Sequence, residues 1–206
     1  MLKVFLVEDE VVMRNGIKNN IPWEQEGFEF AGEASDGELA YPLIKKEKPD
    51  ILITDIRMPF MDGLELSRLV KKELPQIKII ILSGYNEFDY AKTAINIGVT
   101  DYLLKPISSA KLLEAVKKVA DMIEKEQDNA RLIKRYEKEM EENILQEKHK
   151  LWGALASNRL STIELLEKGQ RLGIDFTASA YQVFLFKLMQ EGDATGCSEE
   201  LNRASE

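Results

Sequence analysis

Residues 51–55 read Ile51-Leu52-Ile53-Thr54-Asp55, an uncharged run that ends in a single acid. A run that is apolar on both alternations is typical of a strand buried on both faces, as in a parallel sheet covered by helices. Comparable runs occupy residues 4–7, 28–31, 77–82 and 100–104, which gives five expected strands. We expect the strand at 51–54, with Asp55 at its end, to be central.

Helical patterns separate these strands. Apolar residues recur at intervals of three to four at Leu64, Leu66, Leu69 and Val70, and again at Phe88, Ala91 and Ile95. A fifth helix is expected to start near Ser108, a suitable N-cap. Strand and helix alternating in this way predict an α/β fold with a doubly wound five-stranded parallel sheet. Pro42 is expected to make the second helix start late or kink near Tyr41.

The composition excludes several classes of protein. The 206 residues carry a formal net charge of -8, and an acidic chain is a poor nucleic-acid binder by itself. Cys197 is the only cysteine and His149 the only histidine, which excludes an intrachain disulfide and metal sites rich in these residues. No apolar run approaches the roughly 18 residues of a membrane span. We expect a cytoplasmic protein without a membrane partner.

A long helix is expected over residues 108–156, because no Gly or Pro interrupts residues 107–152. A heptad with Val116 at a and Val119 at d places nine apolar residues at twelve core positions. These twelve are Val116, Ile123, Ala130, Glu137, Ile144 and Leu151 at a, and Val119, Glu126, Ile133, Met140, Glu147 and Ala154 at d. The pattern favours a coiled-coil linker and a parallel homodimer through residues ~116–155. The alternative is one solvated helix folded back on the N-terminal domain.

The last segment, residues 157–206, is less regular. Ser161 and Glu164 have the spacing of a capping box, and Gly173 is expected to end the short helix that follows. Residues 181–189 are expected to form a strand. One helix and one strand cannot enclose a core, so we expect a partial α+β segment that begins an incomplete middle domain.

Polar side chains follow the ends of four strands. They are Glu8 and Asp9 after the first strand, Asp55 at the end of the third, Ser83 after the fourth and Lys105 after the fifth. The carboxyl ends of parallel strands meet at one edge of the sheet, where ligands bind in such folds. Three neighbouring carboxylates repel one another unless a cation neutralises them, and oxygen ligands suit Mg²⁺. We therefore expect a phosphoryl-transfer site with Asp55 as the nucleophile.

Residues 1–120 resemble the receiver domain of two-component response regulators, which have the flavodoxin-like strand order 2-1-3-4-5. The matching segments are Val7-Glu8-Asp9-Glu10, Thr54-Asp55-Ile56-Arg57-Met58-Pro59, Met61-Asp62-Gly63, Leu82-Ser83-Gly84 and Tyr102-Leu103-Leu104-Lys105-Pro106. The resemblance implies that a sensor histidine kinase phosphorylates Asp55. It also implies that Asp9 and Asp55 bind Mg²⁺, aided by the backbone carbonyl of Arg57 and, through water, by Glu8.

The resemblance assigns roles to the other site residues. Ser83 and Lys105 are expected to contact the phosphoryl group, and Tyr102 to be the aromatic residue that reorients on phosphorylation. The Lys105–Pro106 peptide bond is expected to be cis. Such a domain is not an enzyme but a phosphoacceptor that assists its own phosphorylation and dephosphorylation.

Further segments resemble the YesN type of regulator, which ends in an AraC-type helix-turn-helix. These segments are Ile21-Pro22-Trp23-Glu24, Asp55-Ile56-Arg57-Met58-Pro59-Phe60-Met61-Asp62-Gly63, Leu82-Ser83-Gly84-Tyr85-Asn86-Glu87-Phe88-Asp89-Tyr90-Ala91 and, more weakly, Leu172-Gly173-Ile174-Asp175-Phe176. The helix-turn-helix is not among the 206 residues. We therefore expect a truncated transcriptional regulator that would contact DNA only through that missing domain.

Two other functions use similar folds. A phosphatase of the haloacid dehalogenase type also has an aspartyl nucleophile, but it needs a second acid two residues later, where Arg57 stands. A flavodoxin-like cofactor binder needs a phosphate-binding loop after the first strand, and Glu8-Asp9-Glu10 would repel a phosphate. Both are disfavoured against a phosphorylation-dependent regulator.

Overall fold

The computed structural model describes residues 1–84, 88–157 and 159–176. The chain divides into two compact units, Met1–Lys134 and Arg135–Glu206. The strand predicted at residues 181–189 lies outside the described residues.

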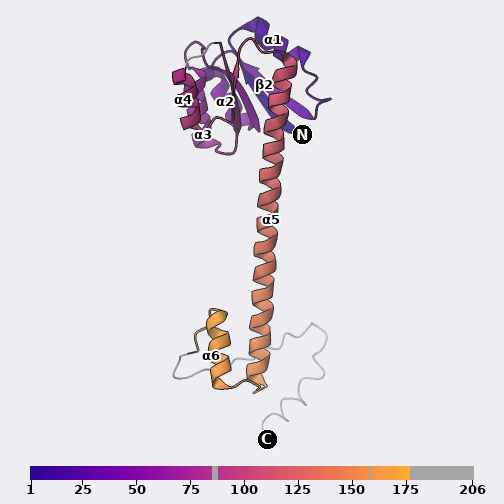
Figure 1. Ribbon diagram of the computed structural model, residues 1–206, viewed down its shortest axis with the longest axis vertical. Coiled ribbons are helices and arrows are strands. Elements are labelled where there is room, and N and C mark those ends of the chain that lie inside the picture. Colours follow the sequence, from indigo (N-terminus) through magenta and orange to yellow (C-terminus); the bar gives the residue numbers. More distant parts are fainter. Residues whose placement is uncertain (85–87, 158, 177–206) are drawn as a thin grey trace, which may run out of the picture. The chain divides into compact units, whose positions relative to one another are not determined.

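The strands of the first unit, which lie in the indigo-to-magenta part of Figure 1, form a five-stranded sheet in the order β2-β1-β3-β4-β5. All neighbouring strands pair in parallel. The strands are β1 (Leu2–Val7), β2 (Phe28–Ala34), β3 (Ile51–Asp55), β4 (Lys78–Ser83) and β5 (Asp101–Leu104). This confirms the doubly wound sheet and its predicted strand order. The central strand β3 is buried along its whole length.

Strand β2 is longer than predicted, because it continues beyond residue 31 to Ala34. The polar residues in this extension hid it from an analysis of apolar runs. Its register against β1 shifts between Val4 and Phe5. A Cβ atom on Gly32 would lie 2.7 Å from the ring of Phe5, so the absent side chain makes room for that ring.

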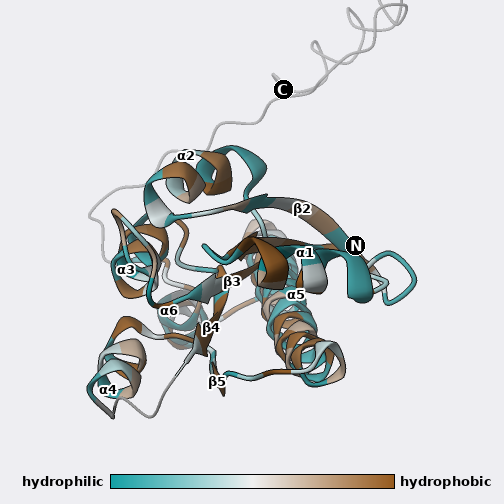
Figure 2. Ribbon diagram, turned by 90° about the horizontal axis from the view of Figure 1, so that it is seen from above, coloured by the Kyte–Doolittle hydropathy of each residue, from teal (hydrophilic) through white to brown (hydrophobic). Residues whose placement is uncertain are grey.

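Helices cover both faces of the sheet (Figure 2). On one face lie α1 (Val11–Asn20) and the first part of α5 (Ser109–Ala156), and on the other lie α2 (Gly37–Glu47), α3 (Gly63–Glu73) and α4 (Phe88–Ile97). Each face has its own apolar cluster, and β3 contributes to both. Ile53 belongs to the cluster with α1 and α5, and Leu52 to the cluster with α2 to α4. This alternation follows from the two-residue period of a strand.

The expected late start of the second helix is wrong. Helix α2 begins at Gly37 and includes Pro42 in its interior. The side chain of Asp36 caps the helix by accepting a hydrogen bond from the Leu39 amide. Ala40 and Ile44 are fully buried against the sheet. The cap and this burial favour a helix that passes through the proline despite the hydrogen bond it removes.

Helix α5 has nearly the predicted bounds, but its first turns serve a different purpose. The side chain of Ser108 caps it, with Oγ 3.3 Å from the Lys111 amide. Val116, Val119 and Ile123 are 0%, 0% and 8% exposed and belong to the core of the first unit. The expectation that these three residues face a second copy of the chain is therefore wrong. An apolar stripe that packs on a sheet has the same spacing as a coiled-coil seam.

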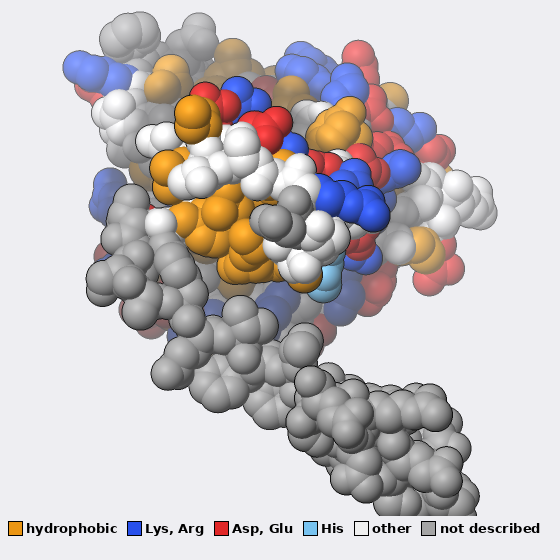
Figure 3. Space-filling view, turned by 90° about the horizontal axis from the view of Figure 1, so that it is seen from below, with side chains coloured by type: hydrophobic (Ala, Val, Ile, Leu, Met, Phe, Trp, Pro, Cys, Tyr) orange, Lys and Arg blue, Asp and Glu red, His pale blue; other side chains and the backbone are white. Residues whose placement is uncertain are grey.

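The described part of the second unit contains the end of α5 and α6 (Thr162–Arg171). The predicted capping box is present, with Ser161 and Glu164 bonding each other's backbone amides. Leu151, another predicted seam residue, is buried. The rings of Trp152 and Phe176 meet edge to face at 5.7 Å. Figure 3 shows hydrophobic side chains gathered on one face of the described part of the second unit. No helix in the described ranges is long and apolar enough to cross a membrane.

Candidate functional site

Three carboxylates meet at the carboxyl end of the sheet, as predicted. Glu8, Asp9 and Asp55 each offer an oxygen, and these atoms all lie within 4.8 Å of one another. Glu8 is fully buried and Asp55 is 7% exposed, whereas Asp9 faces solvent. One side of the cluster is therefore open, and its donors are the hard oxygens that Mg²⁺ prefers.

Lys105 joins two of these carboxylates. Its Nζ lies 2.7 Å from Oδ2 of Asp55, and 2.8 and 3.0 Å from the two carboxylate oxygens of Glu8. The residue follows β5, and its backbone amide donates to the Ser83 carbonyl at 2.7 Å. The peptide bond from Lys105 to Pro106 is cis, which confirms the prediction.

Burial and ion pairing act in opposite directions on this group. Burial raises the pKa of Glu8, although the hydrogen bond from Lys105 offsets part of the effect. Burial would lower the pKa of Lys105, but its hydrogen bonds to Asp55 and Glu8 outweigh this and raise that pKa. Lys105 is therefore an ammonium ion at neutral pH.

The peptide chain around Asp55 fixes the direction of its carboxylate. Oδ1 accepts a hydrogen bond of 2.7 Å from the Ile56 amide, which leaves Oδ2 to Lys105. The hydroxyl of Thr54 donates to the Asp55 carbonyl at 2.9 Å. The amide of Gly63, at the start of α3, donates to the Ile56 carbonyl at 2.9 Å. These bonds close the loop after β3 tightly over the end of that strand.

Ser83 lies at a strand end, as the sequence pattern predicts, whereas Tyr102, which only the family resemblance singled out, lies within β5. Ser83 is 3% exposed at the end of β4. It lines a cavity of about 200 Å³ together with Asp55 and Lys105. Tyr102 packs against the apolar cluster of α2, α3 and α4. Its hydroxyl is buried and has no hydrogen-bond partner among the described residues.

Two residues of the site escaped the sequence analysis. Tyr90, from α4, lines the same cavity, and the guanidinium of Arg57 lies 5.9 Å from the centre of its ring. Only the backbone carbonyl of Arg57 had been assigned a role. Arg14, from α1, donates to the carbonyl groups of Glu8 and Asp9. No sequence motif marks either contact, because each joins a helix to a loop at the end of a strand.

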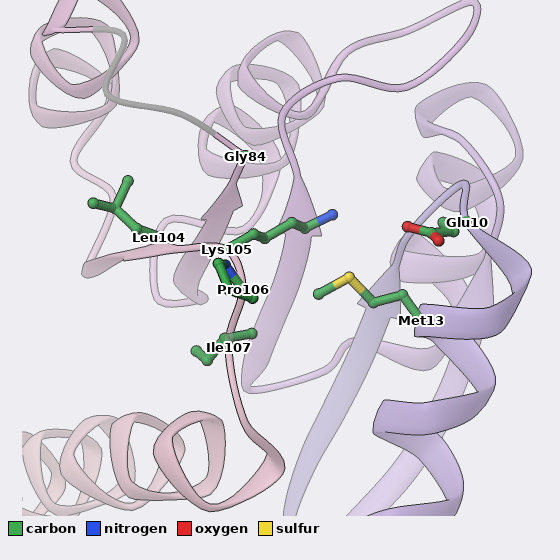
Figure 4. A pocket seen from close by; sticks show the side chains of 7 residues that line it. All are labelled: Glu10, Met13, Gly84, Leu104, Lys105, Pro106 and Ile107. Atoms are coloured by element: carbon green, nitrogen blue, oxygen red, sulfur yellow. The ribbon is translucent and has the colours of Figure 1, made fainter.

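An open groove of about 640 Å³ lies beside the cluster (Figure 4). Its walls come from the start of α1, with Glu10 and Met13, and from the segment after β5, with Lys105 to Ile107. In Figure 4 the side chain of Lys105 points toward α1, while that of Leu104 leaves the strand on the opposite side. Lys105 lines both this groove and the cavity beside Asp55.

The comparisons with known proteins agree with this geometry. Residues 4–117 match the model of the response regulator receiver domain, which is more than half of the 206 residues. The chain therefore belongs to the response regulator receiver family. Its fold is that of the CheY-like receivers, including a receiver domain from Methanospirillum hungatei that is 28% identical, with a TM-score of 0.57.

The chain is similar to several transcriptional regulators. It is 40% identical over 119 residues to the transcriptional regulatory protein YesN of Bacillus subtilis, which covers 58% of this chain and 32% of that protein. It is 39% identical over 132 residues to HptR of Staphylococcus aureus, covering 64% and 52%. The receiver domain of AraT from Geobacillus stearothermophilus is 42% identical, with a TM-score of 0.58, covering 61% and 98%. The matches thus span about a third to a half of these two curated relatives.

Proposed function

We propose that this protein is a cytoplasmic response regulator in which Asp55 accepts a phosphoryl group from a sensor histidine kinase. The observation that carries the proposal is the position of Lys105, whose ammonium group lies 2.7 Å from Asp55 Oδ2. A cation at this distance would stabilise the charge of an incoming phosphoryl group.

The oxygen cluster supports a role for Mg²⁺. Asp9 and Asp55 would hold the ion with the backbone carbonyl of Arg57, and Glu8 would contribute through water. The donors fit, because all are oxygens and two of the three carboxylates lie in a buried pocket. When bound, Mg²⁺ would offset the negative charge that the phosphoryl group brings.

The chemical step needs few groups. An oxygen of Asp55 attacks the phosphorus of a phosphohistidine, the N–P bond breaks, and the imidazole leaves with the electron pair. The ammonium group of Lys105 stays in contact with the phosphoryl oxygens during the transfer, and the Ser83 hydroxyl donates a hydrogen bond to one of them. The product is an acyl phosphate, and the cavity of about 200 Å³ beside Asp55 would hold it. The groove beside Lys105 would admit the histidine of the kinase.

The exposed part of helix α5 supports a homodimer of this chain. Beyond the residues that pack into the core, the seam residues Ile133, Met140 and Ile144 are 57%, 64% and 42% exposed. An apolar stripe of this kind on a charged helix favours pairing with a second copy. Glu137 and Glu147 stand at core positions of the seam and would weaken that pairing. A weak dimer is easily biased by phosphorylation, and in a longer chain it would space two DNA-binding domains.

Mass spectrometry tests the phosphoacceptor. The protein is incubated with acetyl phosphate and Mg²⁺, and the intact mass is measured with and without excess chelator. We expect the mass of one phosphoryl group to be added to the wild type and to Asp89→Asn, a matched control at an exposed acid of α4. We expect no addition to Asp55→Asn. A phosphorylated Asp55→Asn variant would contradict the proposal.

The phosphatase alternative gains no support from the site. The residue two positions after Asp55 is Arg57, and its guanidinium lies against the ring of Tyr90. A general acid for a phosphatase of the haloacid dehalogenase type would have to stand at this position.

A further inference from the structure

Arg14 contacts the backbone of the acidic loop that follows β1. Its Nη1 donates to the Glu8 carbonyl at 2.5 Å and approaches the Asp9 carbonyl at 3.4 Å. Its side chain is only 15% exposed. The guanidinium therefore contacts the backbone of two residues whose side chains belong to the carboxylate cluster.

The guanidinium is itself held in place. Nε of Arg14 lies 3.9 Å from Glu33 in β2, and Lys18, one turn further along α1, lies 3.2 Å from the same carboxylate. The backbone amide of Arg14 bonds the Glu10 carbonyl at 2.9 Å. One residue thus connects α1, the acidic loop and β2.

We propose that Arg14 is a positioning residue for the divalent cation of this site. Glu8, Asp9 and Glu10 are consecutive acids, and their repulsion would spread the loop unless its backbone is held. Hydrogen bonds from a charged, planar donor to two successive carbonyls fix the peptide planes, and hence the directions of the side chains of Glu8 and Asp9. The cation then binds oxygens that are already in place.

The two possible effects of Arg14 on cation binding have opposite signs. If Arg14 acted only as a positive charge near the site, its removal would strengthen the binding of Mg²⁺, because a repulsive charge would be lost. If Arg14 positions the loop, its removal weakens the binding, because Mg²⁺ must then order the loop as it binds. Residues that orient metal ligands typically change metal affinity by about 10- to 100-fold.

Isothermal titration of the full chain with Mg²⁺ alone distinguishes these effects. We expect Arg14→Met to raise the dissociation constant about tenfold, at the lower end of that range. Arg14→Lys, which keeps the charge but loses the planar guanidinium, should give an intermediate value. Lys18→Met is the matched control, since it removes a cation that pairs with the same Glu33 but does not touch the loop. Its dissociation constant should equal that of the wild type or fall below it.

A second measurement separates positioning from a general loss of structure. With acetyl phosphate at saturating Mg²⁺, the rate of Asp55 phosphorylation in Arg14→Met should lie within about twofold of the wild type. Only the Mg²⁺ concentration that gives half of the maximal rate should rise. If Arg14→Met does not fold, Arg14→Lys decides the question by the same titration.

The inference rests on the proposed function, and the outcomes separate the two. An unchanged or lower dissociation constant for Arg14→Met, or for Arg14→Lys where only that variant folds, overturns the role of Arg14 alone. A wild-type chain that binds no Mg²⁺ overturns the proposed metal site and the role of Arg14 with it.

Discussion

Gly63 lies directly against Asp55, because a Cβ atom at position 63 would collide with the carbonyl oxygen of Asp55. The close contact follows from the hydrogen bond between the Gly63 amide and the Ile56 carbonyl, which draws the start of α3 over the end of β3. The proposed phosphoacceptor, Asp55, and the first residue of the next helix are therefore packed backbone to backbone.

Gly63→Ala should destabilise the protein by about 3 kcal/mol, the upper end of the range for overpacking, since the colliding atom belongs to the backbone and cannot rotate away. Urea denaturation measures the change. Gly16→Ala is the matched control in α1, where the nearest atom to an added Cβ is Asn20 Nδ2 at 3.9 Å. That variant should gain roughly 0.5–1 kcal/mol, because alanine is the better helix former. A Gly63→Ala variant as stable as the wild type would contradict the packing described here.

Glu8 should make stability depend on pH. Burial raises its pKa above the ordinary 4.5, so the folded protein holds this proton more tightly than the unfolded chain does. Stability is therefore lost as the pH rises from about 4.5 through the raised pKa. Glu8→Gln removes the buried charge. Its free energy of unfolding, measured by urea denaturation, should exceed that of the wild type by little at pH 4 and by more at pH 7.

Glu10→Gln is the control for this prediction, because Glu10 is an exposed neighbour on the same loop. Its stability relative to the wild type should change little over the same interval. An advantage of Glu8→Gln that shrinks toward neutral pH would show that the sign is wrong.

Tyr102→Phe should stabilise the protein by roughly 1 kcal/mol, because it removes a buried hydroxyl that has no partner among the described residues and keeps the ring. Tyr136→Phe, at a residue 60% exposed on α5, should have an effect within about 0.5 kcal/mol of zero. Both variants are compared by thermal and urea denaturation. A destabilised Tyr102→Phe variant would show that the hydroxyl has a partner.

Ile133→Asp should abolish the proposed homodimer, since it places a charge in the exposed part of the seam. Leu145→Asp makes the same chemical change at a similar exposure, 56% against 57%, but on a different side of α5. Sedimentation of both variants with beryllofluoride and Mg²⁺ measures the association. A wild-type chain that stays monomeric at high micromolar concentration would contradict the dimer, and equal losses from both variants would contradict the seam.

Much of the first unit could be predicted from sequence because its strands are buried on both faces. Continuous apolar runs such as residues 51–54 identify such strands without any knowledge of their neighbours. The polar residues at their ends then meet in space once the strands are parallel. The same reasoning missed the end of β2, where Gly32 and Glu33 interrupt the apolar pattern although the backbone continues to pair.

The rest of the site depends on contacts that leave no periodic signal. Arg14 in α1 contacts Glu8, six residues earlier in the chain. Tyr90 in α4 contacts Arg57, which lies in the loop after β3. The position of Val116 on its helix was predictable, but its partner was not. Only the assembled sheet shows that Val116 packs on the domain's own strands.

The burial of Val119 and Ile123 places the edge of the folded module inside a continuous helix. The match to the receiver family ends at residue 117, yet these two core residues follow it, and Glu126 still forms an ion pair of 2.6 Å with Lys78 at the start of β4. A chimaera that joined this receiver to a foreign output at residue 117 would exchange part of its own hydrophobic core. A junction just after residue 126 leaves that core whole, so the outputs of such regulators are best exchanged in the middle of the helix and not at the apparent end of the domain.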